Sequence, residues 1–267
     1  MQPIESYMLR NKTVLVTGSI AGLGYAIAEA FAQQKANIVL HGLEPIEKIQ
    51  TAVDSLRERF GVAVMYSQAN LTIVAEIEKM IQDINAQFSG VDILVNNAVI
   101  RNFAAIDTLE TTKWNESIEV NLSSAFHTAR LTIPYMKQKK WGRIINISSV
   151  YGTTATPNRV TYVTTKTALI GLTRSIAMDV AKDGITCNAL CPGTVPTPPI
   201  LERLAGFAKR DGITLAQAER DYISTRHPTG RFVALKSVAL FAVFLCGEAG
   251  VDITGAILPV DGGWTIE

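Results

Sequence analysis

The chain of 267 residues contains few cysteines, few aromatic residues and almost no net charge. Cys187, Cys191 and Cys246 are an odd number of cysteines, and no histidine or second cysteine pair accompanies them at metal-ligand spacing. We therefore expect buried thiols in a reducing compartment and no bound metal. With 25 basic and 24 acidic residues the net charge is +1, which gives no long-range field to attract nucleic acid.

No apolar run approaches the roughly 20 residues that span a bilayer. The longest candidate, residues 238–246, is expected to be a core helix. Residues 1–11 include Glu5 and Arg10 and lack the continuous apolar stretch of a secretion signal. These features predict a cytoplasmic protein with no membrane partner.

Short apolar runs alternate with amphipathic stretches along the chain. We expect strands at 13–16, 37–40, 62–66, 93–95, 143–147, 186–189 and 256–260, and helices at 25–34, 46–60, 74–88, 114–139, 160–182 and 238–246. Pro134 predicts a kink or break in its helix. Apolar strands that alternate with helices form parallel sheets with right-handed crossovers. The pattern predicts a doubly wound α/β sheet of seven strands in one domain, residues 1–267.

Residues 194–229 interrupt this alternation. They contain four prolines and one short helical piece. Their proline content and late position predict a mobile excursion over a site, such as a substrate lid.

A glycine-rich turn joins the first predicted strand to the first predicted helix, with the sequence Thr17-Gly18-Ser19-Ile20-Ala21-Gly22-Leu23-Gly24. Gly18 permits a tight turn, Gly22 lets the backbone approach a pyrophosphate, and Gly24 lets the helix pack closely on the strand. The helix N-terminus adds free N–H groups and the positive end of its dipole. Within a βαβ unit this pattern favours nucleotide binding over an ordinary glycine-rich turn.

The end of the second predicted strand distinguishes NAD from NADP. Glu44 lies 20 residues after Gly24, near the position where an acidic group meets a ribose 2′-hydroxyl. Residues 39–44 contain no Lys or Arg to pair with a 2′-phosphate, and Ala21 is uncharged. We therefore expect NAD rather than NADP. The alternative is that Glu44 is a solvated loop carboxylate.

Tyr162 and Lys166 are four residues apart, so they share one face of a helix. A lysine ammonium beside a phenol favours the phenolate, which can accept a proton near neutral pH. Ser149 follows the strand predicted at 143–147, and Asn121 lies within a long predicted helix, where asparagine is a poor helix former. Most Tyr-x-x-x-Lys pairs lie on helix surfaces, but this context makes the pair a candidate for catalysis.

Together these motifs resemble the short-chain dehydrogenase/reductase family. The resemblance covers residues 12–263 and is carried by the glycine turn, Asn96-Asn97-Ala98, Asn121, Ser149, Tyr162-x-x-x-Lys166 and Pro192-Gly193. It implies a Rossmann-type, three-layer α/β/α sandwich with a seven-stranded parallel sheet. It also implies an NAD(P)-dependent oxidoreductase that interconverts a secondary alcohol and a ketone, commonly as a homotetramer.

The resemblance also implies roles for individual residues. Tyr162 would be the general acid/base, Ser149 would bind the substrate oxygen, Lys166 would bind the nicotinamide ribose, and Asn121 would hold a water in a proton relay. Val99 stands where the family usually has Gly. The implied cofactor-binding residues are Gly18, Ile20, Gly22, Leu23, Gly24, Leu43, Glu44, Asn70 (where Asp is usual), Leu71, Asn97, Ala98, Tyr162, Lys166, Pro192, Gly193, Val195 and Thr197.

The C-terminal half is similar to bacterial 3-hydroxybutyrate dehydrogenases, for example in residues 122–128, 227–233 and 259–264. Those enzymes hold the substrate carboxylate with Gln, His and Lys side chains. This chain has other residues at the positions that hold the carboxylate in those enzymes. The substrate-binding residues that we expect are Arg101, Ser149, Tyr151, Arg159, Tyr162 and Arg203.

The arginines indicate the class of substrate. An arginine fork pairs bidentately with a carboxylate, so we expect Arg101, Arg159 and Arg203 to converge on a small hydroxy acid. The alternative for the arginines is that all three are solvated loop residues. The alternative substrate class is a neutral polyol, sugar or cyclic alcohol. A catalytically silent NAD-binding sensor or scaffold is the non-enzyme alternative, and the intact catalytic residues count against it. Trp264 is expected either to close a pocket or to pack as a terminal aromatic residue.

Overall fold

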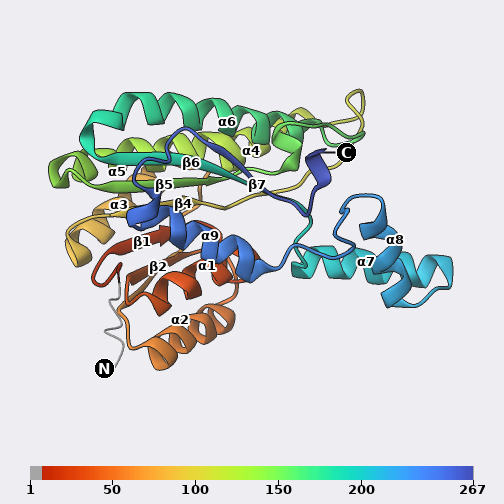
Figure 1. Ribbon diagram of the computed structural model, residues 1–267, viewed down its shortest axis with the longest axis horizontal. Helices are drawn as coiled ribbons and strands as arrows, with labels where there is room; N and C mark the ends of the chain where they lie inside the picture. The colour runs from red at the N-terminus through yellow and green to blue at the C-terminus, as the bar shows by residue number, and fades with distance from the viewer. Residues whose placement is uncertain (1–7, 267) are drawn as a thin grey trace.

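The computed structural model describes residues 8–266 and forms a three-layer α/β/α sandwich (Figure 1). Its sheet has the order β3-β2-β1-β4-β5-β6-β7, and all neighbouring strands are parallel. The predicted Rossmann-type fold is confirmed. Residues 1–7 and residue 267 lie outside the described part. Two predictions therefore reach beyond it, namely the absence of a secretion signal in residues 1–11 and the single domain over residues 1–267. The strands are β1 (Thr13–Val16), β2 (Asn37–His41), β3 (Val64–Ser67), β4 (Ile93–Asn96), β5 (Gly142–Ile147), β6 (Ile185–Pro192) and β7 (Ile257–Val260).

Both faces of the sheet are covered by helices. Val14 and Val16 of β1 pack into one apolar core with α1 (Gly22–Gln33), α2 (Ile46–Phe60) and α9 (Leu235–Cys246). Leu15, between them, packs into the other core with α3 (Val74–Phe88), α5 (Ser124–Lys139) and α6 (Val160–Val180). Because successive strand residues point to opposite faces, β1 is apolar throughout. In residues 8–266 no helix has the length and apolar character needed to cross a membrane.

The sheet places a crevice between β1 and β4. The chain order reverses there, and in open α/β sheets ligands bind outside the carboxyl ends of the strands at such a switch point. The glycine-rich turn after β1 and the segments after β4, β5 and β6 therefore meet at one edge of the sheet.

The helix predicted at 114–139 differs in detail from the prediction. It begins at Thr111 with α4 (Thr111–Ile118), passes through a π-helical turn (Glu119–Ser123) and continues as α5. A kink or break was expected at Pro134, and the helix is not broken there, because α5 continues to Lys139. The π-turn contains Asn121, so the poor helix former marks a change of helix type.

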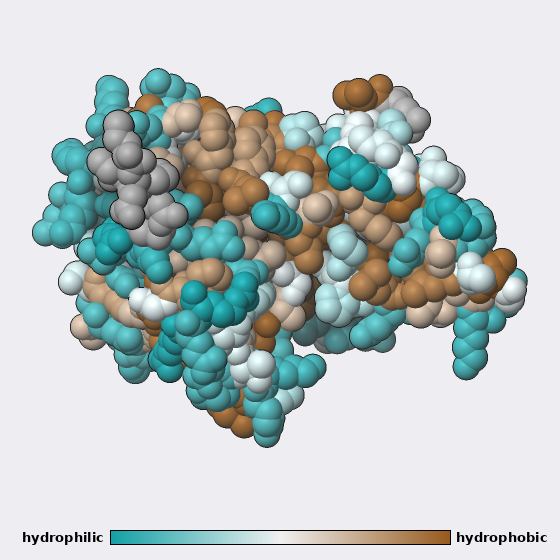
Figure 2. Space-filling model, turned by 60° about the horizontal axis from the view of Figure 1, so that its bottom comes forward, coloured by the Kyte–Doolittle hydropathy of each residue, from teal (hydrophilic) through white to brown (hydrophobic). Residues whose placement is uncertain are grey.

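The segment 194–229 contains two helices, α7 (Pro198–Asp211) and α8 (Leu215–Ser224), where one helical piece was expected. They project beyond the carboxyl ends of the strands, at the right of Figure 1. Each buries only two residues, which are Leu204 and Ala208 in α7 and Ala218 and Ile223 in α8. Figure 2 shows a hollow between this projecting part and the bulk of the molecule.

Candidate active site

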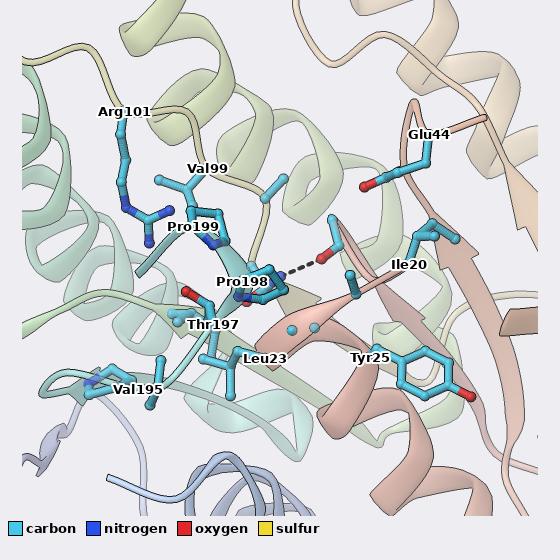
Figure 3. Close-up of a pocket in the computed structure, with 18 of the residues that line it drawn as sticks. Ile20, Leu23, Tyr25, Glu44, Val99, Arg101, Val195, Thr197, Pro198 and Pro199 are labelled. Carbon is cyan, nitrogen blue, oxygen red and sulfur yellow. Dashed lines mark hydrogen bonds between the residues drawn. The ribbon is translucent and has the colours of Figure 1, made fainter. Parts of the chain in front are cut away.

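A cleft of about 870 Å³, hereafter the large cleft, opens at the carboxyl edge of the sheet (Figure 3). It extends from the glycine-rich turn, past Glu44 at one side, to the ends of β4, β5 and β6. All the predicted cofactor-binding residues line it except Leu43, Asn70 and Leu71.

Leu43, Asn70 and Leu71 lie outside the lining of the large cleft, and their cofactor-binding role stays a prediction. The Leu43 side chain is exposed to solvent, and Leu71 is buried in the apolar core. The side-chain oxygen of Asn70 accepts hydrogen bonds from the backbone and the hydroxyl of Thr72. Asn70 therefore closes a local turn before α3 and does not line the large cleft.

The glycine-rich turn is held tightly against the end of β4. Gly18 has φ +61°, and a Cβ at this position would lie 2.9 Å from Ala98 Cα. The amide of Asn97 donates to the carbonyls of Thr17 (2.9 Å) and Gly18 (2.7 Å). The hydroxyl of Thr17 in turn accepts from the backbone N–H groups of Asn97 and Ala98. A Cβ at Gly24 would overlap the Gly18 carbonyl oxygen, so only glycine fits there.

His41 braces the same turn, a role that the sequence analysis missed. The backbone N–H of Gly18 donates to Nδ1 of His41 (3.1 Å), and Nε2 lies 2.8 Å from the carbonyl of Ala69. Burial lowers the pKa of His41. A neutral ring with its proton on Nε2 satisfies both contacts. The position of His41 at the end of β2, beside the switch point, was the only sequence signal for this role.

The walls of the large cleft contain polar atoms that have no partner within the described residues. Glu44 turns its carboxylate towards the cleft (Figure 3), and Oε2 is buried without a hydrogen bond. Thr197 Oγ1 is likewise buried and unpaired. Burial and the Glu44 charge raise the pKa of Tyr66, whose hydroxyl donates to the Gly42 carbonyl. Buried polar atoms are normally satisfied, so these two atoms fit the hydrogen-bonding groups of a dinucleotide.

Three of the four predicted catalytic residues meet at the inner end of the large cleft. Tyr162 and Lys166 lie in the first two turns of α6, and Ser149 follows β5. Lys166 Nζ donates to the Ile147 carbonyl (2.6 Å) and lies 5.8 Å from the centroid of the Tyr162 ring. Burial, followed by the Arg101 charge, lowers the pKa of Lys166 to about 7.

The fourth residue, Asn121, is buried beside the site and lines neither cavity. Its Oδ1 accepts from the Ile100 N–H (2.8 Å), and its Nδ2 donates to the Ile100 carbonyl (3.0 Å). The π-turn thus holds the loop after β4 through two hydrogen bonds. This loop carries Val99 and Arg101, which both line the large cleft.

A second cavity of about 140 Å³, hereafter the arginine cavity, adjoins the catalytic residues. All six predicted substrate-binding residues line it, and Trp264 also does, with its ring centroid 5.5 Å from that of Tyr151. Phe103 and Tyr222 are further lining residues that the sequence analysis missed. They belong to no motif, because they are brought in from the loop after β4 and from α8.

The arginine cavity is strongly cationic. No Asp or Glu lines it, and Arg101, Arg159 and Arg203 form no ion pair with any carboxylate of residues 8–266. Burial, with the Arg203 charge second, lowers the pKa of Arg159. All three arginines therefore line one cavity, in which Arg159 and Arg203 are half-buried and Arg101 is exposed, and their substrate-binding role stays a prediction.

The comparisons with known proteins agree with this geometry. Residues 12–203 match the family described as short chain dehydrogenase. The chain belongs to this family and is an oxidoreductase of the class that acts on secondary alcohols.

Two of its relatives are called D-beta-hydroxybutyrate dehydrogenase. The protein of Cupriavidus necator is 41% identical over 260 residues, which cover 97% of this chain and all of that protein. The protein of Rhizobium meliloti is 40% identical over 257 residues, which cover 96% of this chain and all of that protein. Among solved structures, L-sorbose reductase of Gluconobacter frateurii, complexed with NADPH and L-sorbose, has a TM-score of 0.94 at 30% identity and covers 98% of this chain and 99% of its own.

Proposed function

We propose that the chain is an NAD-dependent dehydrogenase that interconverts a small hydroxy acid and the corresponding keto acid. The observation that carries the proposal is the arginine cavity, in which Ser149 and Tyr162 face three arginines and no carboxylate. The relatives called D-beta-hydroxybutyrate dehydrogenase support the same class of substrate.

The proposal assigns the following roles to the chain's own groups. When bound, the nicotinamide cofactor supplies the hydride acceptor or donor. The Tyr162 hydroxyl exchanges the proton of the substrate oxygen, and the Ser149 hydroxyl donates a hydrogen bond to that oxygen, where charge develops. Lys166 in its charged form favours the tyrosinate and binds the ribose. The Asn121 segment supports a water relay to solvent.

The preference for NAD rests on Glu44. Its unpaired, buried carboxylate oxygen can accept a ribose hydroxyl and would repel a 2′-phosphate. Titration of the protein should give tighter binding of NAD than of NADP. Glu44→Gln should reduce this preference by about tenfold, the effect of about 1.4 kcal/mol. Tighter NADP binding by the unaltered protein, the cofactor type of the L-sorbose reductase structure, would contradict the proposal.

The substrate class is tested by kinetics with 3-hydroxybutyrate and a panel of hydroxy acids, polyols and sugars, monitored by the absorbance of the reduced nicotinamide. Arg159→Ala should raise KM for 3-hydroxybutyrate by about tenfold or more, because a charge-assisted hydrogen bond is lost. Arg174→Ala is the matched control, since Arg174 lies on the exposed side of α6 and lines neither cavity. An unchanged KM in Arg159→Ala would remove the arginine argument.

A neutral sugar or polyol is the second candidate substrate, and the likeness to L-sorbose reductase favours it. A higher kcat/KM for L-sorbose or a polyol than for any hydroxy acid would establish this alternative. Cofactor binding without turnover of any compound would instead indicate a sensor.

The remaining parts of the proposal concern the molecule as a whole. We propose that residues 1–267 form a single domain and that residues 194–229 form a lid. We also propose that the protein is a cytoplasmic homotetramer. Light scattering coupled to gel filtration measures the oligomeric state directly.

A further inference from the structure

The arginine cavity holds more positive charge than one carboxylate can neutralise. Arg101, Arg159 and Arg203 all line it, and no acidic side chain of residues 8–266 compensates any of them. Arg159 and Arg203 are half-buried, and partly buried charges are costly unless a partner compensates them, whereas Arg101 is exposed to solvent. A substrate with a single carboxylate would leave part of this charge uncompensated.

Arg159 and Arg203 form one pair within the cavity. Arg159 precedes α6 and lies over the Phe103 ring, with Cζ 3.9 Å from the ring centroid. Arg203 comes from α7 and donates from Nη2 to the Tyr222 hydroxyl (2.6 Å), while its Nε is buried without a partner. Because aromatic side chains hold both guanidinium groups in place, their remaining N–H groups are available for one carboxylate.

Arg101 stands apart from this pair, at the catalytic end. Its Cζ lies 5.6 Å from the centroid of the Tyr162 ring, and its side chain extends from the loop after β4 towards Pro199 (Figure 3). The Arg101 charge helps to lower the pKa of Lys166, whereas the Arg203 charge helps to lower the pKa of Arg159. The cavity therefore offers two positions for anions, one at the Arg159–Arg203 pair and one at Arg101 beside the catalytic tyrosine.

We infer that the substrate is a small hydroxydicarboxylate, with one carboxylate between Arg159 and Arg203, the second on Arg101, and the carbinol carbon between them. This inference rests on the proposed function and narrows it. The cavity volume of about 140 Å³ suits an acid of four or five carbons. Malate differs from 3-hydroxybutyrate only in carrying a carboxylate in place of the methyl group, so the two form a matched pair.

The test compares kcat/KM, at saturating NAD, for achiral 3-hydroxyglutarate and for each enantiomer of malate, 3-hydroxyglutarate monomethyl ester and 3-hydroxybutyrate. We expect the two dicarboxylates to exceed the two monocarboxylates by about tenfold or more, because each charge-assisted contact contributes roughly that factor. Arg101→Gln should lower the ratio of dicarboxylate to monocarboxylate by about the same factor.

Arg210→Gln is the matched control. Arg210 is on α7, is exposed, pairs with Asp211 and lines neither cavity, so this variant should keep the ratio. Inhibition by succinate and by butyrate gives a second measurement that needs no turnover, and succinate should bind more tightly.

Equal or better use of 3-hydroxybutyrate would overturn the inference and leave the proposed function standing. Turnover of neutral alcohols alone would overturn both. An unchanged ratio in Arg101→Gln would overturn the second anion position.

Discussion

At the scale of single residues, the proposed chemistry depends on the hydroxyl of Tyr162. Tyr162→Phe removes that hydroxyl and should lower kcat by about 10²- to 10⁴-fold, the usual contribution of a general acid/base. NAD binding should change little, since the ring remains in place. Steady-state rates and an NAD titration measure the two effects. Tyr135→Phe, on α5 and away from both cavities, is the control. A full rate in Tyr162→Phe would refute the assignment.

Lys166 makes a prediction about pH. Its pKa is about 7 in the fold, against 10.5 for an unperturbed lysine, chiefly because of burial. Between these values the unfolded chain binds a proton that the folded chain does not, so this residue makes the free energy of unfolding rise as the pH increases. Below pH 7 Lys166 is charged in both the folded and the unfolded chain, so the full cost of burying its charge lowers the free energy of unfolding.

Lys166→Met should therefore stabilise the cofactor-free protein near pH 6, by about 2 kcal/mol. The gain should shrink as the pH rises towards 10. Urea denaturation of both proteins across this range gives the difference directly. A gain that is independent of pH would show that the amine does not titrate as described.

At the scale of elements, the turn between β1 and α1 tolerates no side chain at Gly24. Gly24→Ala would force the turn away from the end of β4, so NAD should bind at least about tenfold more weakly and stability should fall by about 1–3 kcal/mol. Gly171→Ala is the matched control, because Gly171 lies in α6 with open space around the position of a Cβ. It should stabilise the protein by about 0.5–1 kcal/mol. Calorimetry measures the stability of both variants, and titration measures their affinity for NAD. Equal stability and equal NAD affinity in the two variants would contradict the packing argument.

Elements with strong periodicity were predictable from the sequence. The bounds of α2 and α3 agree with the prediction, because their apolar residues recur with the helical period. The start of α1 was predicted at Tyr25 but lies at Gly22, where the glycine-rich turn rather than helix propensity determines the conformation. Likewise β6 extends to Pro192, beyond the predicted end at Ala189, because it pairs with β7.

The site was predictable where chemistry follows short spacings. Tyr162, Lys166 and the glycine-rich turn could be identified from neighbouring residues. The contacts of His41 with Gly18 and of Tyr222 with Arg203 could not, because they depend on how separate elements pack. The π-turn was also hidden, since periodicity does not distinguish it from a continuous helix.

At the scale of the whole molecule, a net charge of +1 coexists with a strongly cationic cavity. Attraction of the substrate is therefore a local effect. Raising the ionic strength from about 0.05 M to about 0.5 M shortens the screening length about threefold, so KM for an anionic substrate should rise by about two- to fivefold. KM for a neutral alcohol, where one is turned over, is the control. A KM for the anion that does not depend on salt would argue against charge recognition.

The π-turn at 119–123 also constrains how the chain can change in length. Each residue advances a helix by about 100°, and the extra residue held in the π-turn sets the rotational phase between α4 and α5. Asn121 holds Ile100, and Ser117, one turn earlier, accepts a hydrogen bond from Asn102. Deleting one residue between Ser117 and Asn121 would rotate one side chain by about 100° relative to the other. Only one of the two contacts, to Ile100 or to Asn102, could then form. Insertions and deletions should therefore not be tolerated within this helix.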